Sequence, residues 1–232
     1  MSAQVKGVWV TTADGTTNPR RRGGRPTTAR GDGQLLFLRE FVRAPLRTAS
    51  VIPSSRSLAE QMVRPLNHRD WTRRAPVVLE LGPGTGAFTR VIQETAPKGT
   101  RHLGIELNPA MARHLSSTFP DVEVIVGAAA DLPHMLHRLG VDGVDLIISG
   151  LPWQSFAGPA GPRLVDTIAS CLALGGTYTQ FTYSWTRWAP PARRQHRTLH
   201  ESFDEVQISR TIWRNLPPAF VYTSTRPTPA DR

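Results

Sequence analysis

One stretch of the chain has the residue types and the spacing of a cofactor-binding loop. An apolar run with Glu80 near its end leads into three alternating glycines, Gly82, Gly84 and Gly86, and a helical pattern follows. This order predicts a strand, a tight loop and the start of a helix. Glycines adopt backbone angles that other residues avoid, and they let a ligand approach the main chain closely. We therefore expect the loop to bind a nucleoside-bearing cofactor.

The spacing separates this loop from other nucleotide sites. The G-x-G-x-x-G form places its third glycine one residue later, and the Walker form needs a Gly-Lys-Ser/Thr that is absent here. A second apolar run ends at Glu106, 20 residues after Gly86. An acid there accepts hydrogen bonds from the ribose hydroxyls of a bound nucleoside. The alternative is a glycine turn that only packs a helix on a strand, and the second acid argues against it.

The motif Glu-x-Gly-x-Gly-x-Gly, with an acid ending the next strand, resembles the class I S-adenosylmethionine-dependent methyltransferases. In that family the acid of the glycine motif, here Glu80, faces the amino-acid end of the cofactor. The resemblance implies S-adenosylmethionine as cofactor and S-adenosylhomocysteine as product. It assigns cofactor binding to Glu80, Gly82, Gly84, Thr85, Gly86, Glu106, Leu107, Asp131 and Gly150.

Length and composition agree with a soluble enzyme. The 232 residues suffice for one α/β domain with a short extension. There is no apolar run of the roughly 18 residues that cross a bilayer, and no signal peptide is visible. The single cysteine, Cys171, lies in an apolar helical pattern and is expected to be a small core residue. These features predict a cytoplasmic protein, in peripheral contact with the inner face of the plasma membrane if the substrate is a lipid.

The formal net charge of +10 comes almost entirely from arginine. Such a charge implies attraction to an anionic partner, either nucleic acid or a membrane surface with acidic lipids. An arginine-rich composition also arises in genomes of high GC content, so charge alone does not choose among these explanations.

The pattern divides the chain into four segments. Residues 1–33 are rich in Gly, Thr, Pro and Arg without a hydrophobic period, which predicts a disordered basic tail, with a phosphate-binding arm as the alternative. Residues 34–70 are expected to form N-terminal helices. Residues 71–226 are expected to form the cofactor-binding methyltransferase domain, and residues 227–232 a second tail.

The first of the N-terminal helices is amphipathic and basic. Leu35, Leu38 and Phe41 share one face, and Arg39 and Arg43 lie on another. A helix laid over the edge of the core explains this pattern. So does a membrane contact, in which the apolar stripe enters the headgroup layer and the arginines meet phosphates. After it, a serine cap within residues 51–57 predicts a helix to about Leu66 that lies across the cofactor cleft.

After the glycine loop, apolar runs alternate with helical patterns, as a parallel sheet with crossover helices requires. We expect an α/β, Rossmann-like fold with a seven-stranded, mostly parallel sheet and helices on both faces. The expected strands are Val77–Leu81, His102–Glu106, Val122–Val126, Val144–Ser149, Thr177–Thr182, Glu205–Arg210 and Phe220–Thr223. The expected helices are Ala87–Thr95, Pro109–Thr118, Leu132–Leu139, Gly161–Leu172 and Ala192–Glu201.

The fourth expected strand ends in Ser149-Gly150-Leu151-Pro152-Trp153. Ligands of open α/β sheets bind beyond the carboxyl ends of the strands, so we expect the methyl acceptor here. Pro152 restricts the turn and exposes the Leu151 carbonyl, and Trp153 offers an apolar face beside a sulfonium or ammonium charge. Core packing is the alternative role of Trp153.

The same segment bears on the substrate. The ribosomal RNA adenine dimethyltransferases have a similar glycine motif but carry Asn-Leu-Pro-Tyr or a close variant here, and the Asn side chain binds the exocyclic amine. Gly150 replaces that Asn, which disfavours an adenine substrate.

Several motifs in order resemble the soluble bacterial phospholipid N-methyltransferases, from Leu35 to about Tyr222. They are the Phe37–Phe41 helix, Ala49–Ser55, Glu80–Gly86, Ser149–Trp153, Gln180–Tyr183, and Val206 through Trp213–Ala219. That family methylates the amine of phosphatidylethanolamine or related aminolipids at the membrane surface, and its N-terminal amphipathic helix contacts the membrane. One departure concerns adenine: the family's Asp after the third strand is Ala128 here, so that either Asp131 or a backbone carbonyl must replace it.

Methyl transfer from a sulfonium needs a neutral nucleophile, held in line and shielded from water. The candidates for aligning or deprotonating an amine are Leu151, Trp153 and Tyr183, with Tyr178 and His196 as weaker ones for which packing is the alternative. No metal site is expected, because the seven histidines are scattered and no Cys/His ligand spacing occurs.

The sequence thus predicts an S-adenosylmethionine-dependent methyltransferase that acts on the amine of a phospholipid or related aminolipid. One alternative acceptor is a small metabolite bound among apolar residues such as Trp153 and Trp185. Ribosomal RNA is another, weakened by Gly150. A further alternative is a non-enzymatic module that binds RNA or a membrane and retains the fold. This alternative predicts that the chain no longer binds the cofactor. The oligomeric state is left open.

Overall fold

The computed structural model describes residues 3–5, 8–10, 54–153 and 160–228. Most of the segment 1–33 lies outside these residues, but two short strands within it are described, β1 (Ala3–Val5) and β2 (Val8–Val10). Disorder in the rest of that segment stays a prediction. The residues of the expected amphipathic helix also lie outside the described ranges, namely Leu35, Leu38, Arg39, Phe41 and Arg43.

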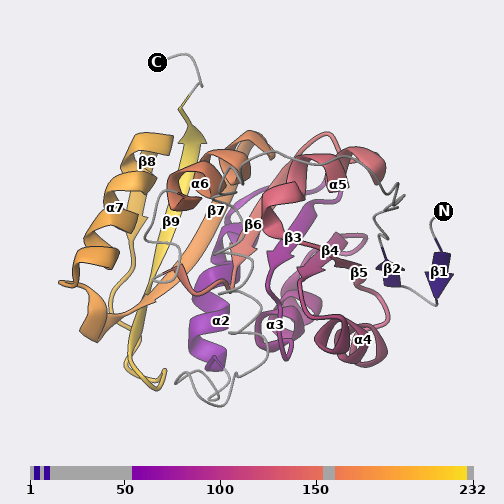
Figure 1. Ribbon diagram of the computed structural model, residues 1–232, viewed down its shortest axis with the longest axis horizontal. Coiled ribbons are helices and arrows are strands. Elements are labelled where there is room, and N and C mark those ends of the chain that lie inside the picture. Colours follow the sequence, from indigo (N-terminus) through magenta and orange to yellow (C-terminus); the bar gives the residue numbers. More distant parts are fainter. Residues whose placement is uncertain (1–2, 6–7, 11–53, 154–159, 229–232) are drawn as a thin grey trace, which may run out of the picture.

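A single sheet forms the centre of the molecule, with the strand order β1-β2-β5-β4-β3-β6-β7-β9-β8 (Figure 1). Its main strands are β3 (Val77–Leu81), β4 (Arg101–Glu106), β5 (Glu123–Val126), β6 (Val144–Ser149), β7 (Leu172–Tyr183), β8 (Phe203–Ile208) and β9 (Ala219–Pro227). Strands β3 to β7 are mutually parallel, and β9 runs antiparallel between β7 and β8. The seven strands β3 to β9 confirm the predicted Rossmann-like class.

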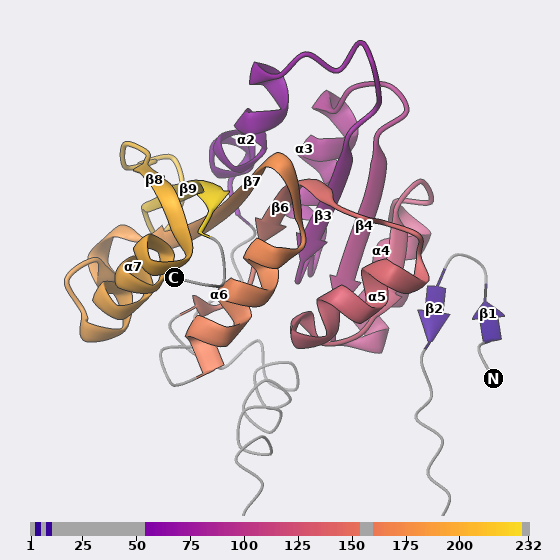
Figure 2. The ribbon, with the colours of Figure 1, turned by 90° about the horizontal axis from the view of Figure 1, so that it is seen from above.

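Helices cover both faces of the sheet, as Figure 2 shows. They are α2 (Arg56–Val63), α3 (Ala87–Thr95), α4 (Pro109–Thr118), α5 (Leu132–Arg138), α6 (Ala160–Ser170) and α7 (Pro190–Ser202), with short 3-10 turns η1 (Arg64–His68), η2 (Ala129–Asp131) and η4 (Ser184–Thr186). In the described ranges, none of them combines the length and apolar character of a membrane-crossing segment.

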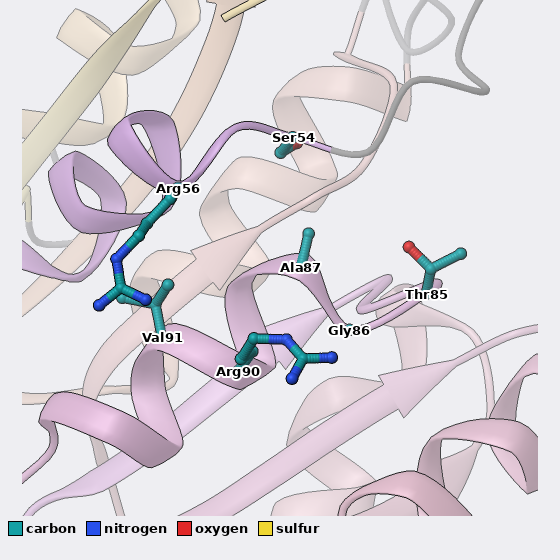
Figure 3. A pocket seen from close by; sticks show the side chains of 7 residues that line it. All are labelled: Ser54, Arg56, Thr85, Gly86, Ala87, Arg90 and Val91. Atoms are coloured by element: carbon teal, nitrogen blue, oxygen red, sulfur yellow. The ribbon is translucent and has the colours of Figure 1, made fainter. Parts of the chain in front are cut away.

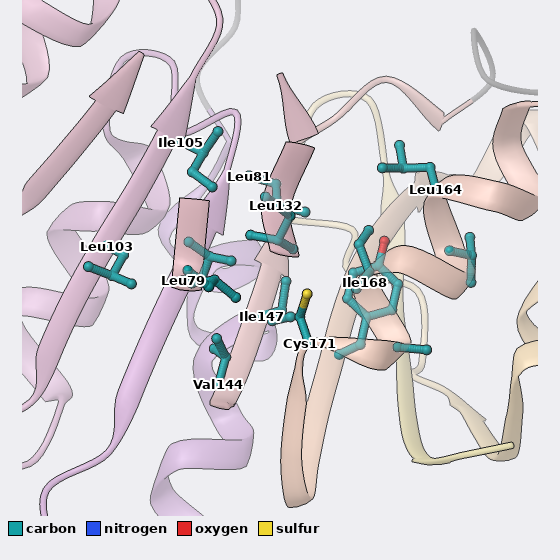
Figure 4. Close-up of a cluster of buried hydrophobic side chains, with 14 of the residues drawn as sticks. Leu79, Leu81, Leu103, Ile105, Leu132, Val144, Ile147, Leu164, Ile168 and Cys171 are labelled. Atoms are coloured by element: carbon teal, nitrogen blue, oxygen red, sulfur yellow. The ribbon is translucent and has the colours of Figure 1, made fainter. Parts of the chain in front are cut away.

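Alternation along the strands buries apolar side chains on both faces of the sheet. On β3, Leu79 and Leu81 pack toward α5 and α6, together with Ile147 of β6 (Figure 4). Val78 lies on the opposite face with Ile148, against α2 and α3. All six residues of β6 are buried, because a central parallel strand is covered on both sides. This double burial explains why the strands appear in the sequence as continuous apolar runs.

The main departure from the expected elements lies between α6 and β7. The predicted helix extends to Leu172, but α6 ends at Ser170, and the Cys171 carbonyl accepts a hydrogen bond from the Val144 N–H at 3.0 Å. Cys171 is therefore a buried residue of a turn and not of a helix. Strand β7 begins at Leu172 rather than Thr177, because its first residues pair with the start of β6 through an irregular register.

A buried aspartate anchors the amino-terminal end of β6, opposite the edge where the glycine loop lies. Asp145 accepts hydrogen bonds from both terminal nitrogens of Arg74, at 2.6 and 2.5 Å, and from the Val77 N–H at 2.9 Å. Burial acts to raise the pKa of Asp145, but these hydrogen bonds and the charges of Arg74 and Arg69 outweigh it and lower the pKa. The ionised carboxylate thus joins β3 and β6 to the segment before them.

We expect Asp145→Ala to reduce the free energy of unfolding at neutral pH by about 2–3 kcal/mol, because Arg74 and the Val77 N–H lose their acceptor. A lowered folded-state pKa stabilises the fold above the unfolded pKa of aspartate, and this contribution is lost as pH falls through the folded value. The gap between wild type and variant should therefore narrow in acid. Denaturant unfolding at several pH values measures it. Arg226→Ala, which breaks an exposed ion pair with Glu205, is the control and should change little.

Candidate active site

The glycine loop lies at the carboxyl end of β3, where it turns directly into α3. Gly82, Gly84 and Gly86 all have positive φ, at 68°, 56° and 82°, and Gly86 caps the amino end of α3. The loop is held from the neighbouring strand, since the Gly82 N–H donates to the carbonyl of Ile105 at 2.9 Å. Backbone N–H groups at a helix start favour negative or polar ligand groups.

Glu106, the second predicted acid, contacts this loop directly. Glu106 at the end of β4 is buried, with one oxygen accepting from the Gly84 N–H at 3.1 Å and the other from the Asn108 N–H at 2.9 Å. Burial raises the pKa of Glu106, and the hydrogen bonds from the backbone of Asn108, Gly84 and Leu107 offset this only in part. The glycine loop and this acid are thus in direct contact, and their joint binding of a nucleoside stays a prediction.

The segment after β6 meets the glycine loop backbone to backbone. The Gly150 N–H donates to the carbonyl of Leu81 at 2.9 Å, and a Cβ added at Gly150 would lie 2.7 Å from the carbonyl oxygen of Gly82. In turn, the Leu151 side chain lies 3.1 Å from where a Cβ on Gly82 would be. No side chain fits at Gly150 in this arrangement, so the Asn of the adenine enzymes has no room here.

The acid of the glycine motif faces the interior. Glu80 is 1% exposed, and one of its oxygens accepts from the Thr89 hydroxyl at 2.6 Å and from His102 Nε2 at 3.0 Å. The side-chain amide of Gln93 donates to the other ring nitrogen of His102, at 2.8 Å, which assigns the proton to Nε2. The second oxygen of Glu80 is buried and has no hydrogen-bond partner in the described part of the chain.

A cavity of about 410 Å³ adjoins the loop between α2 and α3 (Figure 3). It is lined by Ser54, Arg56, Thr85, Gly86, Ala87, Arg90 and Val91. The expected serine cap is Ser55, whose hydroxyl accepts a hydrogen bond from the Leu58 N–H at 3.2 Å. Helix α2 therefore begins at the rim of this cavity. The α-helix ends at Val63 and the predicted range to Leu66 continues as the 3-10 turn η1, while its position across the cofactor cleft stays a prediction.

The three residues predicted to act on the acceptor are not gathered together. Leu151 lies against the glycine loop. Trp153 is 3% exposed, donates its indole N–H to the Ser149 hydroxyl at 2.9 Å and packs edge-on against Tyr178. Tyr183 is half-buried on the other face of the sheet, packed edge-on against Phe181. The burial of Trp153 favours the packing role that the sequence leaves open.

The weaker candidates are also placed. Burial raises the pKa of Tyr178 well above 10, and its hydroxyl donates to Gln180 at 2.9 Å, so this residue is no base near neutral pH. His196 lies on α7, and burial, with the charges of His200 and Arg187, lowers its pKa. Neither group contacts the glycine loop among the interactions of the described residues.

The residues that the sequence predicts to bind adenine form a turn. Asp131 ends η2 with an exposed side chain, and its N–H donates to the carbonyl of Ala128 at 3.0 Å. No side-chain hydrogen bond of Asp131 caps α5. The structure therefore leaves the Asp131 carboxylate open to solvent beside the end of β5.

Sequence reasoning missed the partners of Glu80 and the arginines of the cavity. His102 lies opposite Val78 in the parallel register of β3 and β4, and Thr89 is on the first turn of α3. The spacing of residues along the sequence did not indicate these contacts, because strand register and helix rotation decide which side chains meet. Arg90 follows the glycine motif by four residues, the only local hint that it lines the same cavity.

Comparisons with known proteins identify the family. A family model described as a methyltransferase domain matches residues 78–176. The ornithine lipid N-methyltransferase of Singulisphaera acidiphila is 34% identical over 81% of this chain and 93% of its own length. The chain belongs to the class I S-adenosylmethionine-dependent methyltransferases. Its cofactor is S-adenosylmethionine.

Two further relatives extend the comparison. The ribosomal RNA small subunit methyltransferase A of Chlorobaculum parvum is 29% identical, but over only 47% of this chain and 38% of that protein. The O-methyltransferase of Bacillus cereus, solved in complex with S-adenosylhomocysteine, has the same fold with a TM-score of 0.56 and 16% identity, over 86% of this chain and 94% of that one.

The residues present fit this cofactor. The unpartnered buried oxygen of Glu80 offers an acceptor below the glycine loop. Among the described residues, both oxygens of Glu106 accept only from backbone N–H groups, so each has a lone pair for another donor. The absence of side chains at Gly82 and Gly150 lets the two loop backbones approach each other closely at this edge of the sheet.

We expect Gly150→Ala to lower the free energy of unfolding by about 1–3 kcal/mol and to weaken S-adenosylmethionine binding, because the new Cβ forces the two loops apart. Thermal unfolding and calorimetric titration measure the two effects. Gly104→Ala is the matched control, since its Cβ would lie 3.5 Å from its nearest neighbours, an ordinary contact distance. Unchanged affinity and stability in Gly150→Ala would contradict the close contact.

Proposed function

We propose that this methyltransferase acts on the amine of a phospholipid or a related aminolipid at a membrane surface. The match to an ornithine lipid N-methyltransferase carries the proposal, because it spans most of both chains. The lack of space for a side chain at Gly150 supports a non-adenine acceptor. The net charge of +10 is compatible with an anionic membrane surface.

Glu106 is our proposed ligand of the ribose hydroxyls. Its carboxylate is already oriented by the N–H groups of Gly84 and Asn108, so binding needs no rearrangement of the side chain. Gly82, Thr85 and Gly86 face the amino-acid end, with Glu80 below them. Asp131 is the proposed adenine ligand, with the Ala128 backbone as the alternative.

The acceptor amine is proposed to lie beside Gly150 and Leu151. The bound cofactor supplies a methyl group on a sulfonium, a leaving group that needs no further activation. The chain has to hold a neutral amine in line and keep water away. Among the described residues, the Leu151 carbonyl accepts one hydrogen bond, from the backbone N–H of Trp153 at 2.9 Å, and retains a lone pair that can position the amine. Tyr183 is the further candidate at the end of β7.

A ribosomal RNA acceptor is the alternative with a specific observation behind it, the partial match to a ribosomal RNA methyltransferase. Gly150 weighs against it, because its surroundings exclude the amide side chain that binds adenine in those enzymes. Aminolipid remains the acceptor that the residues support better.

Labelled-methyl transfer tests the proposal directly. Purified chain and labelled S-adenosylmethionine are incubated in parallel with total lipid, total RNA and a small-molecule extract. We expect label in the lipid fraction, and at least a tenfold loss in Glu106→Ala, which removes about 1.4 kcal/mol or more of cofactor binding. Polar substitution of Leu35, Leu38 and Phe41 should reduce transfer to vesicles. Label in RNA alone would sink the proposal.

Glu106 also predicts a pH dependence of cofactor binding. Its raised pKa means that some of the carboxyl is protonated above the usual glutamate range, and ribose hydroxyls bind the ionised form better. Affinity should therefore rise with pH through the folded-state pKa. In Glu106→Gln, which cannot ionise, calorimetric titrations should give a weaker affinity that no longer varies over this range. An unaltered pH profile in Glu106→Gln would exclude Glu106 as the titrating group.

A further inference from the structure

Four large apolar side chains stand exposed on two loops. They are Trp185, Trp188, Trp213 and Leu216, which we call the tryptophan surface, with exposed fractions of 72%, 72%, 78% and 68%. Isolated exposed apolar residues are common, but large ones gathered on adjoining loops mark an interaction site.

The two loops adjoin each other. The Ser184 N–H donates to the carbonyl of Pro218 at 2.8 Å, and Tyr183 pairs with Ala219 where β7 meets β9. One loop follows β7 and carries the first two tryptophans. The other joins β8 to β9 and carries Trp213 and Leu216 (Figure 1).

The tryptophan surface lies at the edge of the sheet that holds the active site. Strand β8 runs parallel to β7, since both are antiparallel to β9, so the β8–β9 loop follows a carboxyl end just as the glycine loop does. Buried Asn215 secures the connection: its side-chain oxygen accepts the Ser55 N–H at 2.8 Å. Ser55 begins α2 at the rim of the cavity beside Thr85 and Gly86.

The surroundings of this surface are basic. Arg187, Arg210 and Arg214 are exposed on the same two loops, and neither loop contains an Asp or Glu. The Arg187 guanidinium stacks over Trp188, 5.5 Å from its ring centroid. The exposed face of α7 adds Arg193, Arg194 and Arg197.

This combination fits the interface of an anionic bilayer better than the other partners. Tryptophan prefers the headgroup region, where its ring is apolar and its N–H is hydrated, and arginines meet lipid phosphates there. Single-stranded RNA would use the rings and arginines for stacking but would leave Leu216 without a role. A second copy of the chain would have to bring like-charged arginine clusters together.

We propose that the tryptophan surface docks the chain on anionic lipid headgroups and places the active-site edge against the membrane. The inference rests on the proposed function in one respect, that the acceptor amine belongs to a lipid which never leaves the bilayer. It is a contact separate from the N-terminal helix proposed from sequence.

Vesicle binding by the full chain tests this surface. Co-sedimentation is measured with vesicles of equimolar phosphatidylglycerol and phosphatidylcholine, for wild type and for the double variant Trp188→Ser, Trp213→Ser. We expect the partition coefficient of the double variant to fall about tenfold or more, because two rings lose their apolar contact. Leu174→Ser is the matched control: Leu174 is fully exposed, but near the opposite end of β7, and its variant should bind as wild type does.

Equal vesicle binding by wild type and the double variant would overturn the inference. So would a loss in that variant of RNA binding or of self-association without any loss of vesicle binding. Methyl transfer to aminolipid dissolved in detergent micelles separates the two proposals. Micellar activity retained by a double variant that no longer binds vesicles supports both. If the double variant loses vesicle binding but the wild type methylates no lipid, the proposed function is refuted and the docking surface stands.

Discussion

The close approach of two loop backbones organises this protein. The glycine loop after β3 and the segment after β6 touch at Gly82 and Gly150, where a Cβ would lie 2.7 Å from a carbonyl oxygen. The contact is possible because β3 and β6 are adjacent parallel strands whose carboxyl ends meet at one edge. The glycine loop and the segment after β6 are thereby held together by main-chain atoms, which have fewer internal degrees of freedom than side chains.

Buried polar groups hold this arrangement from both ends of the sheet. Glu106 accepts N–H groups from the glycine loop and from Asn108, which positions its carboxylate before any ligand arrives. At the far end, Asp145 ties the start of β6 to Arg74. Each carboxylate is costly to bury, and each is satisfied by several donors. The glycine loop, the segment after β6 and the Asp145 contacts therefore form one connected structure, which is held in place before any ligand binds.

Much of the fold was predictable because local and tertiary preferences agree. The expected bounds of β3, β6, α3 and α4 match the structure, since each apolar run is buried as its pattern requires. The start of β7 was not predictable, because Leu172 to Gly176 has the composition of a helix end and a loop and becomes strand only by pairing with β6. The turn at Cys171 was not predictable for the same reason, because it depends on a hydrogen bond from the Val144 N–H of β6 to the Cys171 carbonyl.

For the site, the sequence by itself determined the glycine loop, the acid at Glu106 and the missing side chain at Gly150, because these depend on residue type and short spacing. Only the tertiary structure decided which groups meet: that Thr89 and His102 take one oxygen of Glu80, that Trp153 packs in the core, and that Trp188 and Trp213 stand exposed on adjoining loops. Side chains distant along the chain meet through strand register and helix rotation, and no local pattern records either of these.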